Sequence, residues 1–85
     1  MRREPEYFGE QELPLLFIAK RLRDALRIEQ ALTEAGVDYL VETDTYSGGV
    51  IFRGERVGAF FYVRESDAEA ARLVLGRSGF EPYRA

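Results

Sequence analysis

The stretch 56–64 is the sequence feature that most restricts the fold of this chain. Every residue between Arg56 and Arg64 is apolar or small. A strand with one face in water alternates apolar and polar residues, whereas an unbroken apolar run is typical of a strand covered on both faces. A second run of this kind lies at 15–19. The sequence therefore predicts two buried strands in the centre of a sheet.

A helical pattern follows each of these runs. In 24–35 the apolar residues recur at spacings of three and four, which indicates one buried stripe on a helix. The second helix is expected to begin at Ser66, because Ser66 and Glu69 have the spacing of a capping box. Gly36 and Gly79 follow the two helical patterns, where a left-handed residue ends a helix.

The order of these elements predicts the fold class. Residues 38–46 alternate like an edge strand, and 80–84 are expected to form a short last strand that contains Pro82. Two strand–helix–strand units in sequence give the order βαββαβ. We therefore expect an α+β, ferredoxin-like sandwich, with an antiparallel sheet and two helices on one face.

The chain is short enough for one domain, which we place at 14–85. Residues 1–13 mix charge with proline and glycine and show no period, so we expect a flexible N-terminal tail. The alternative is that Tyr7 and Phe8 form an aromatic hook that docks on the domain.

Both faces of the two central strands are apolar, but two helices cover only one face. By alternation Phe60 and Tyr62 share one side of their strand, and Leu16 and Ile18 share one side of theirs. Contiguous exposed apolar patches usually mark interfaces. We expect these residues to form the interface of a homodimer, or else to be covered by the tail or by the apolar segment 50–52.

Composition removes several chemistries. The chain contains no cysteine and no histidine, so thiolate or histidine metal sites and histidine-based catalysis are absent. Its net charge of −3 argues against nucleic-acid binding. No apolar run approaches the roughly 20 residues of a membrane span, and no signal peptide is recognisable. We expect a cytoplasmic, non-enzymatic protein with no catalytic residue, no cofactor and no metal.

The loop after the second strand is the alternative site. Ser47, Gly48 and Gly49 can form a nest of backbone amides, and Arg53 and Arg56 can supply donors to an anionic metabolite. A solvated turn beside arginines explains the same residues.

A second basic cluster lies at the start of the first helix. It comprises Lys20, Arg21, Arg23 and Arg27 and is a candidate anion site, with Asp24 opposing it. The competing interpretation is a solvated, charged helix surface.

Three stretches carry a resemblance to a known family: the strand 15–19, the helix ending 31–37 and the strand–acidic turn–alanine-rich helix 61–71. Together they resemble a small bacterial domain of unknown function, described as a prokaryotic signal-transducing protein. The resemblance implies the ferredoxin-like core of PII nitrogen-regulatory proteins and a non-enzymatic module. In PII proteins the loop between the second and third strands meets partners; the corresponding loop here, 46–56, is shorter and has no phosphate-binding signature, so ATP binding is not implied.

Overall fold

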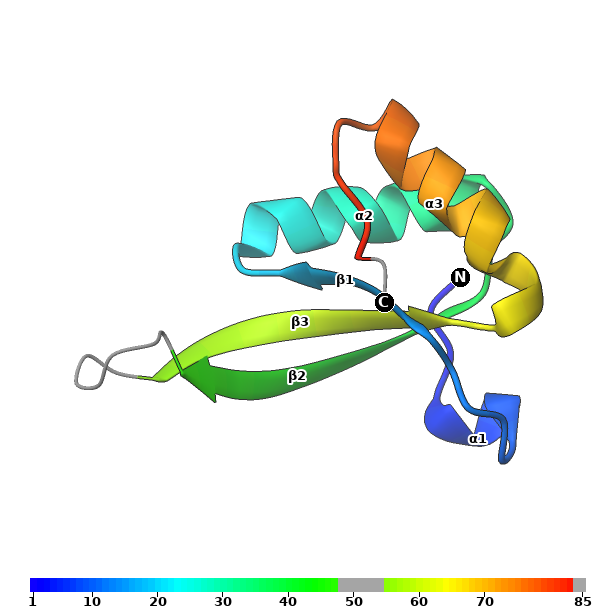
Figure 1. The fold of residues 1–85 in the computed structure, drawn as a ribbon, viewed down its shortest axis with the longest axis horizontal. Coiled ribbons are helices and arrows are strands. Elements are labelled where there is room, and N and C mark those ends of the chain that lie inside the picture. The colour runs from blue at the N-terminus through cyan, green and yellow to red at the C-terminus, as the bar shows by residue number, and fades with distance from the viewer. Residues whose placement is uncertain (48–54, 84–85) are drawn as a thin grey trace.

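The computed structural model describes residues 1–47 and 55–83, and their side chains apart from those of 44–47 and 55–57. It has an antiparallel sheet and helices, as expected for an α+β protein (Figure 1). The elements in chain order are α1 (Pro5–Phe8), β1 (Leu15–Ala19), α2 (Leu22–Glu34), β2 (Tyr39–Ser47), β3 (Glu55–Val63), a 3-10 helix (Glu65–Asp67) and α3 (Ala68–Arg77).

The sheet has three strands in the described part of the chain, in the order β1-β3-β2. The prediction of two central strands is confirmed for the run 56–64, because β3 pairs antiparallel with both neighbours, but not for 15–19, because β1 lies at an edge of the described sheet. Its ladder with β2 runs over the whole strand, whereas its ladder with β1 ends at the pair Ala19 and Ala59. The β2–β3 hairpin therefore extends beyond the end of β1 (Figure 1).

Helices α2 and α3 lie together on one face of the sheet (Figure 1). The apolar stripe predicted for the first helix is confirmed, since Ala25, Ile28 and Leu32 are buried. Full burial of an aliphatic or aromatic side chain stabilises a domain by about 1.5–3 kcal/mol. The largest side chains with almost no exposure come from both layers: Tyr39, Phe61, Leu16, Ile28, Leu32, Leu75 and Val63.

The predicted glycine endings of both helices are confirmed. Gly36 and Gly79 have positive φ angles of 76° and 91°, which glycine adopts without the steric cost of a Cβ atom. In each ending the next amide donates to the carbonyl five residues earlier, as in a Schellman motif. These bonds are Val37 N to Leu32 O at 3.0 Å and Phe80 N to Leu75 O at 2.9 Å.

The predicted capping box at the start of the second helix is wrong. Ser66 lies inside the 3-10 helix, and α3 begins only at Ala68. The N-cap of α3 is Asp67, which makes no side-chain cap hydrogen bond. The chain enters α3 through a tighter turn, so Ser66 is not at the position where its hydroxyl can cap the helix.

The N-terminal segment has a defined conformation, although the sequence predicts a flexible tail at 1–13. Arg2 forms a parallel bridge with Tyr39, and the amide of Arg3 donates to the Tyr39 carbonyl at 2.8 Å. Helix α1 then lies on the side of the sheet opposite α2 and α3 (Figure 1). Phe8 is only 2% exposed, which agrees with the alternative of a docked aromatic hook.

The C-terminal segment runs past the outer edge of β1. In the described residues 80–83 no strand forms, so the predicted strand 80–84 is absent from that part. One backbone bond joins the two segments, from Tyr83 N to Leu16 O at 2.7 Å. The ring of Phe80 packs edge-on against Phe17 at 5.5 Å between centroids.

Candidate functional site

The sheet face opposite α2 and α3 carries three of the four residues expected to form an interface. Phe60 and Tyr62 alternate with the buried residues of β3, and both are half-buried. Ile18 is paired with Phe60 in the β1–β3 ladder, so the two share a face, and Ile18 is also half-buried. On the other neighbouring strand, β2, the residue paired with Phe60 is Glu42, which is exposed.

Leu16 does not lie on this face, so the prediction that it shares a side with Ile18 is wrong. The register of β1 shifts between Leu15 and Phe17, which places Leu16 at an irregularity in the ladder. Leu16 is 1% exposed and belongs to the core cluster under the helices. Because a bulge changes the phase of alternation, Leu15 takes the position on the open face, paired with Tyr62.

The N-terminal segment covers one end of this face. Leu40 is paired with Tyr62, and its exposure is only 9%. Helix α1 lies below this end of the sheet, near the start of β2 (Figure 1). The part of the face that stays partly open is therefore the pair Ile18 and Phe60, toward the β2–β3 hairpin.

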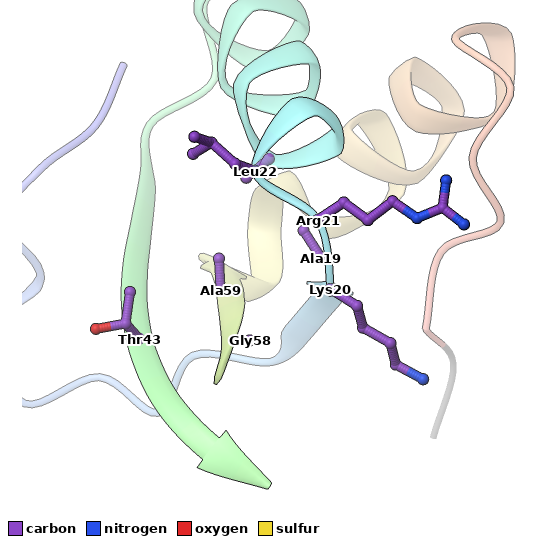
Figure 2. A pocket seen from close by; sticks show the side chains of 8 residues that line it. Ala19, Lys20, Arg21, Leu22, Thr43, Gly58 and Ala59 are labelled. Carbon is purple, nitrogen blue, oxygen red and sulfur yellow. The ribbon is translucent and has the colours of Figure 1, made fainter. Parts of the chain in front are cut away.

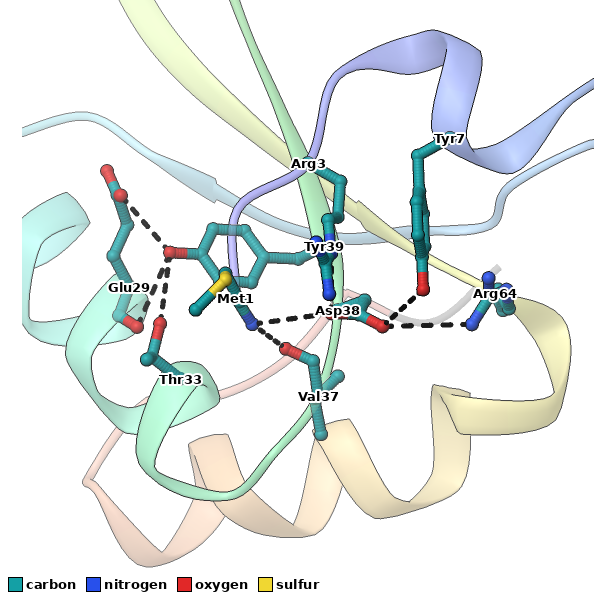
Figure 3. Close-up of polar contacts among 9 residues, drawn as sticks. All are labelled: Met1, Arg3, Tyr7, Glu29, Thr33, Val37, Asp38, Tyr39 and Arg64. Atoms are coloured by element: carbon teal, nitrogen blue, oxygen red, sulfur yellow. Dashed lines mark hydrogen bonds and ion pairs between the residues drawn. The ribbon is translucent and has the colours of Figure 1, made fainter.

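Asp38 holds the N-terminal segment against the start of β2 (Figure 3). Arg3 Nε donates to Asp38 Oδ1 at 2.9 Å, and the Tyr7 hydroxyl donates to Oδ2 at 3.1 Å. Arg64 Nη1 lies 3.9 Å from the same Oδ2. The guanidinium carbons of Arg3 and Arg64 also lie 4.4 Å and 5.0 Å from the centre of the Tyr7 ring, within the range of cation–π attraction.

These contacts favour the ionised form of Asp38. Burial by itself raises the pKa of this carboxyl, but the hydrogen bonds from Arg3 and Tyr7 and the nearby positive charges outweigh burial. The pKa of Asp38 is therefore lowered from its ordinary value. The cluster is a structural clasp between the N-terminal segment and the sheet.

A second set of hydrogen-bonded polar side chains joins β2 to α2 (Figure 3). The hydroxyl of the buried Tyr39 donates to Glu29 Oε1 at 3.2 Å and lies 3.4 Å from Thr33 Oγ1. Burial is the main reason that the pKa of Tyr39 is raised. The hydroxyl stays protonated and serves as a donor in this link.

A hollow of about 190 Å³ lies where the N-terminal end of α2 passes over the sheet (Figure 2). Its floor is a row of small side chains that are paired across the three strands, Ala19, Ala59 and Thr43. The other lining residues are Lys20, Arg21, Leu22, Ala25 and Gly58. The basic residues at the start of α2 could be identified from the sequence as a candidate site. The hollow could not, because only the strand register brings the small residues together.

The alternative loop site falls mostly outside the described residues. Gly48, Gly49 and Arg53 lie there entirely. Ser47 and Arg56 are described only as backbone, at the far end of the β2–β3 ladder. An anion site at this loop stays a prediction.

The candidate binding surfaces in the described part of the chain are the open sheet face and the hollow beside the start of α2. Within residues 1–47 and 55–83, no group of three or more Asp and Glu residues is arranged to hold a metal ion. None of the described helices has the length and apolar character to cross a membrane. No protein-family model, curated protein or solved structure matches this chain.

Proposed function

We propose that this chain is a non-enzymatic binding module that acts by protein–protein association through the sheet face opposite α2 and α3. The observation that carries the proposal is the half-buried pair Ile18 and Phe60, which lies beyond the end covered by α1. Leaving a side chain of this size in water forgoes about 1.5–3 kcal/mol. A second copy of the chain that covers this pair would recover part of that free energy, so the proposed assembly is a homodimer.

The proposed fold is a variant of the ferredoxin-like βαββαβ sandwich, in which residues 80–83 take the place of the fourth strand beside the outer edge of β1 without forming a strand. The hydrogen bond from Tyr83 to Leu16 supports this proposal, because it lies at the edge where that strand would add. The resemblance to prokaryotic signal-transducing domains supports a regulatory role in the cytoplasm.

Light scattering across a range of protein concentrations tests the association. We expect wild-type protein to approach the mass of a dimer at high concentration and to dissociate on dilution. Phe60→Ser should remain monomeric, because it removes the largest apolar side chain from the open part of the face. The double variant Phe60→Ser with Tyr62→Ser should behave in the same way.

The matched control is Leu73→Ser. Leu73 is 60% exposed on α3, so this variant makes a similar loss of apolar surface on another side of the molecule. It should dimerise like the wild type. A wild type that is monomeric at every concentration would overturn the homodimer, and a Phe60→Ser variant that dimerises normally would overturn the assignment of the face.

A further inference from the structure

The turn from β1 into α2 is a basic surface on an acidic chain. Lys20, Arg21 and Arg23 are all exposed, while the net charge of the chain is −3. Within the described residues, no ion pair involves Arg21 or Arg23. Arg27 is turned away, because its Nη2 donates to the Ser78 carbonyl at 3.2 Å.

The hollow beside this turn is apolar and large enough for one bulky side chain. The next row of the sheet is filled by Phe17, Phe61 and Val41, whereas the row of Ala19, Ala59 and Thr43 leaves about 190 Å³ beneath α2. An apolar cavity of about 150 Å³ accepts a benzene-sized molecule. The hollow therefore has room for a leucine or phenylalanine side chain from another molecule.

Basic residues separate this hollow from a second depression. Lys20 and Arg21 line both, and the second one is also lined by Phe17, Ile18 and Phe80. In Figure 2 the side chains of Lys20 and Arg21 point away from the first hollow. A small molecule inside the hollow would not reach their charged ends, but an extended chain that crosses the turn would contact both the hollow and the cations.

We propose that this surface binds an acidic protein segment that inserts one apolar anchor residue into the hollow. The carboxylates of the segment lie over Arg21 and Arg23, and the anchor packs on Ala19, Ala59 and Ala25. Charge complementarity supplies the preference for an acidic partner, and the hollow supplies the preference for an apolar side chain. The hollow and its cations share no residue with the proposed dimer face, although Ile18 of that face lines the neighbouring depression, and the proposal goes beyond the proposed function.

A labelled synthetic peptide, EDDLDE, tests the proposal by fluorescence anisotropy at low salt. We expect saturable binding that weakens at least about tenfold when the peptide leucine is replaced by serine, because serine lacks the apolar surface that leucine buries in the hollow. A peptide with lysines in place of its acidic residues should not bind. Free glutamate should not compete, because it lacks the anchor.

Four variants locate the binding surface. Arg21→Glu should weaken binding at least about tenfold by reversing a charge, and Ala59→Leu should weaken it by filling the hollow. Arg77→Glu is the matched control, because Arg77 is an exposed arginine on α3 that does not line this hollow, and its binding should match the wild type. Asp24→Asn should bind more tightly, since Asp24 lies beside Lys20 and Arg21 and repels an acidic segment.

The outcomes separate this proposal from its competitors. Equal binding of the leucine and serine peptides, or equal effects of Arg21→Glu and Arg77→Glu, would overturn it in favour of nonspecific attraction. Absence of binding to wild-type protein at millimolar peptide would also overturn it. Since Arg21→Glu changes an exposed residue, its result stands even if Ala59→Leu fails to fold. Phe60→Ser should bind the peptide normally, so failure of the dimer leaves this test intact.

Discussion

Replacing Phe8 with alanine tests whether the N-terminal segment is part of the folded domain. Phe8 is 2% exposed in the structure, although it belongs to a four-residue helix near the chain start. If α1 is docked as described, Phe8→Ala removes almost all of a buried ring from the side of the sheet opposite α2 and α3. We expect a loss of about 2–3 kcal/mol in the free energy of unfolding.

The size of this effect follows from two limits. Phenylalanine-to-alanine changes in closed cores cost about 3–5 kcal/mol, because a cavity remains. Here the segment can leave the sheet instead, so the loss cannot exceed the free energy with which it docks. For 85 residues the whole domain is expected to be stable by about 4–13 kcal/mol, so the change is a large fraction of the total.

Urea denaturation followed by circular dichroism measures this difference. Leu73→Ala is the control, because Leu73 is 60% exposed and its truncation should cost less than about 0.5 kcal/mol. A Phe8→Ala variant that undocks its segment should also unfold with a smaller m-value, since less surface remains to be exposed. A loss below about 0.5 kcal/mol with an unchanged m-value would show that the segment is frayed and that the reasoning is wrong.

Three further predictions concern the clasp, a helix ending and the bulge. The pKa of Asp38 is lower in the folded state, so its contribution to stability is present above its unfolded pKa of about 3.9 and is lost as the pH falls through its folded pKa. Asp38→Asn should therefore make the urea midpoint less dependent on pH in the acid range. An unchanged pH dependence would refute the role of Asp38 in the clasp. Gly36→Ala should cost about 1–2 kcal/mol by thermal unfolding, because it places a Cβ atom at a φ of 76°, whereas a neutral effect would argue against this helix ending. Leu16→Ala should lower the free energy of unfolding in urea by about 2–5 kcal/mol, and Leu15→Ala should lower it by clearly less, because Leu15 is only half-buried. A larger loss for Leu15→Ala would indicate that β1 alternates regularly and has no bulge at Leu16.

Much of the secondary structure could be predicted because its signals are local. The run 15–19 has the same bounds as β1, and the unbroken apolar run around Phe61 marks the central strand. The helix endings at Gly36 and Gly79 could be predicted because their geometry depends on only a few neighbouring residues. The start of α3 was mispredicted, since the same residues around Ser66 also fit a 3-10 turn.

The candidate sites were predictable only in part. Alternation along β3 correctly put Phe60 and Tyr62 on one side and Phe61 on the other. It failed for Leu16, because a bulge is a property of the pairing between two strands and not of either strand alone.

The sequence by itself determined the alternation of β3, the stripe of α2 and the two glycine endings, since each depends on residues within a few positions of one another. Only the tertiary structure decided that Phe8 is buried. It also decided that Asp38 binds Arg3 and Tyr7, which lie 35 and 31 positions away in the chain. It also decided that Ala19, Ala59 and Thr43 form one row beneath α2. A hollow of this kind forms where the strand register places small residues opposite one another. The packing of the whole sheet fixes that register.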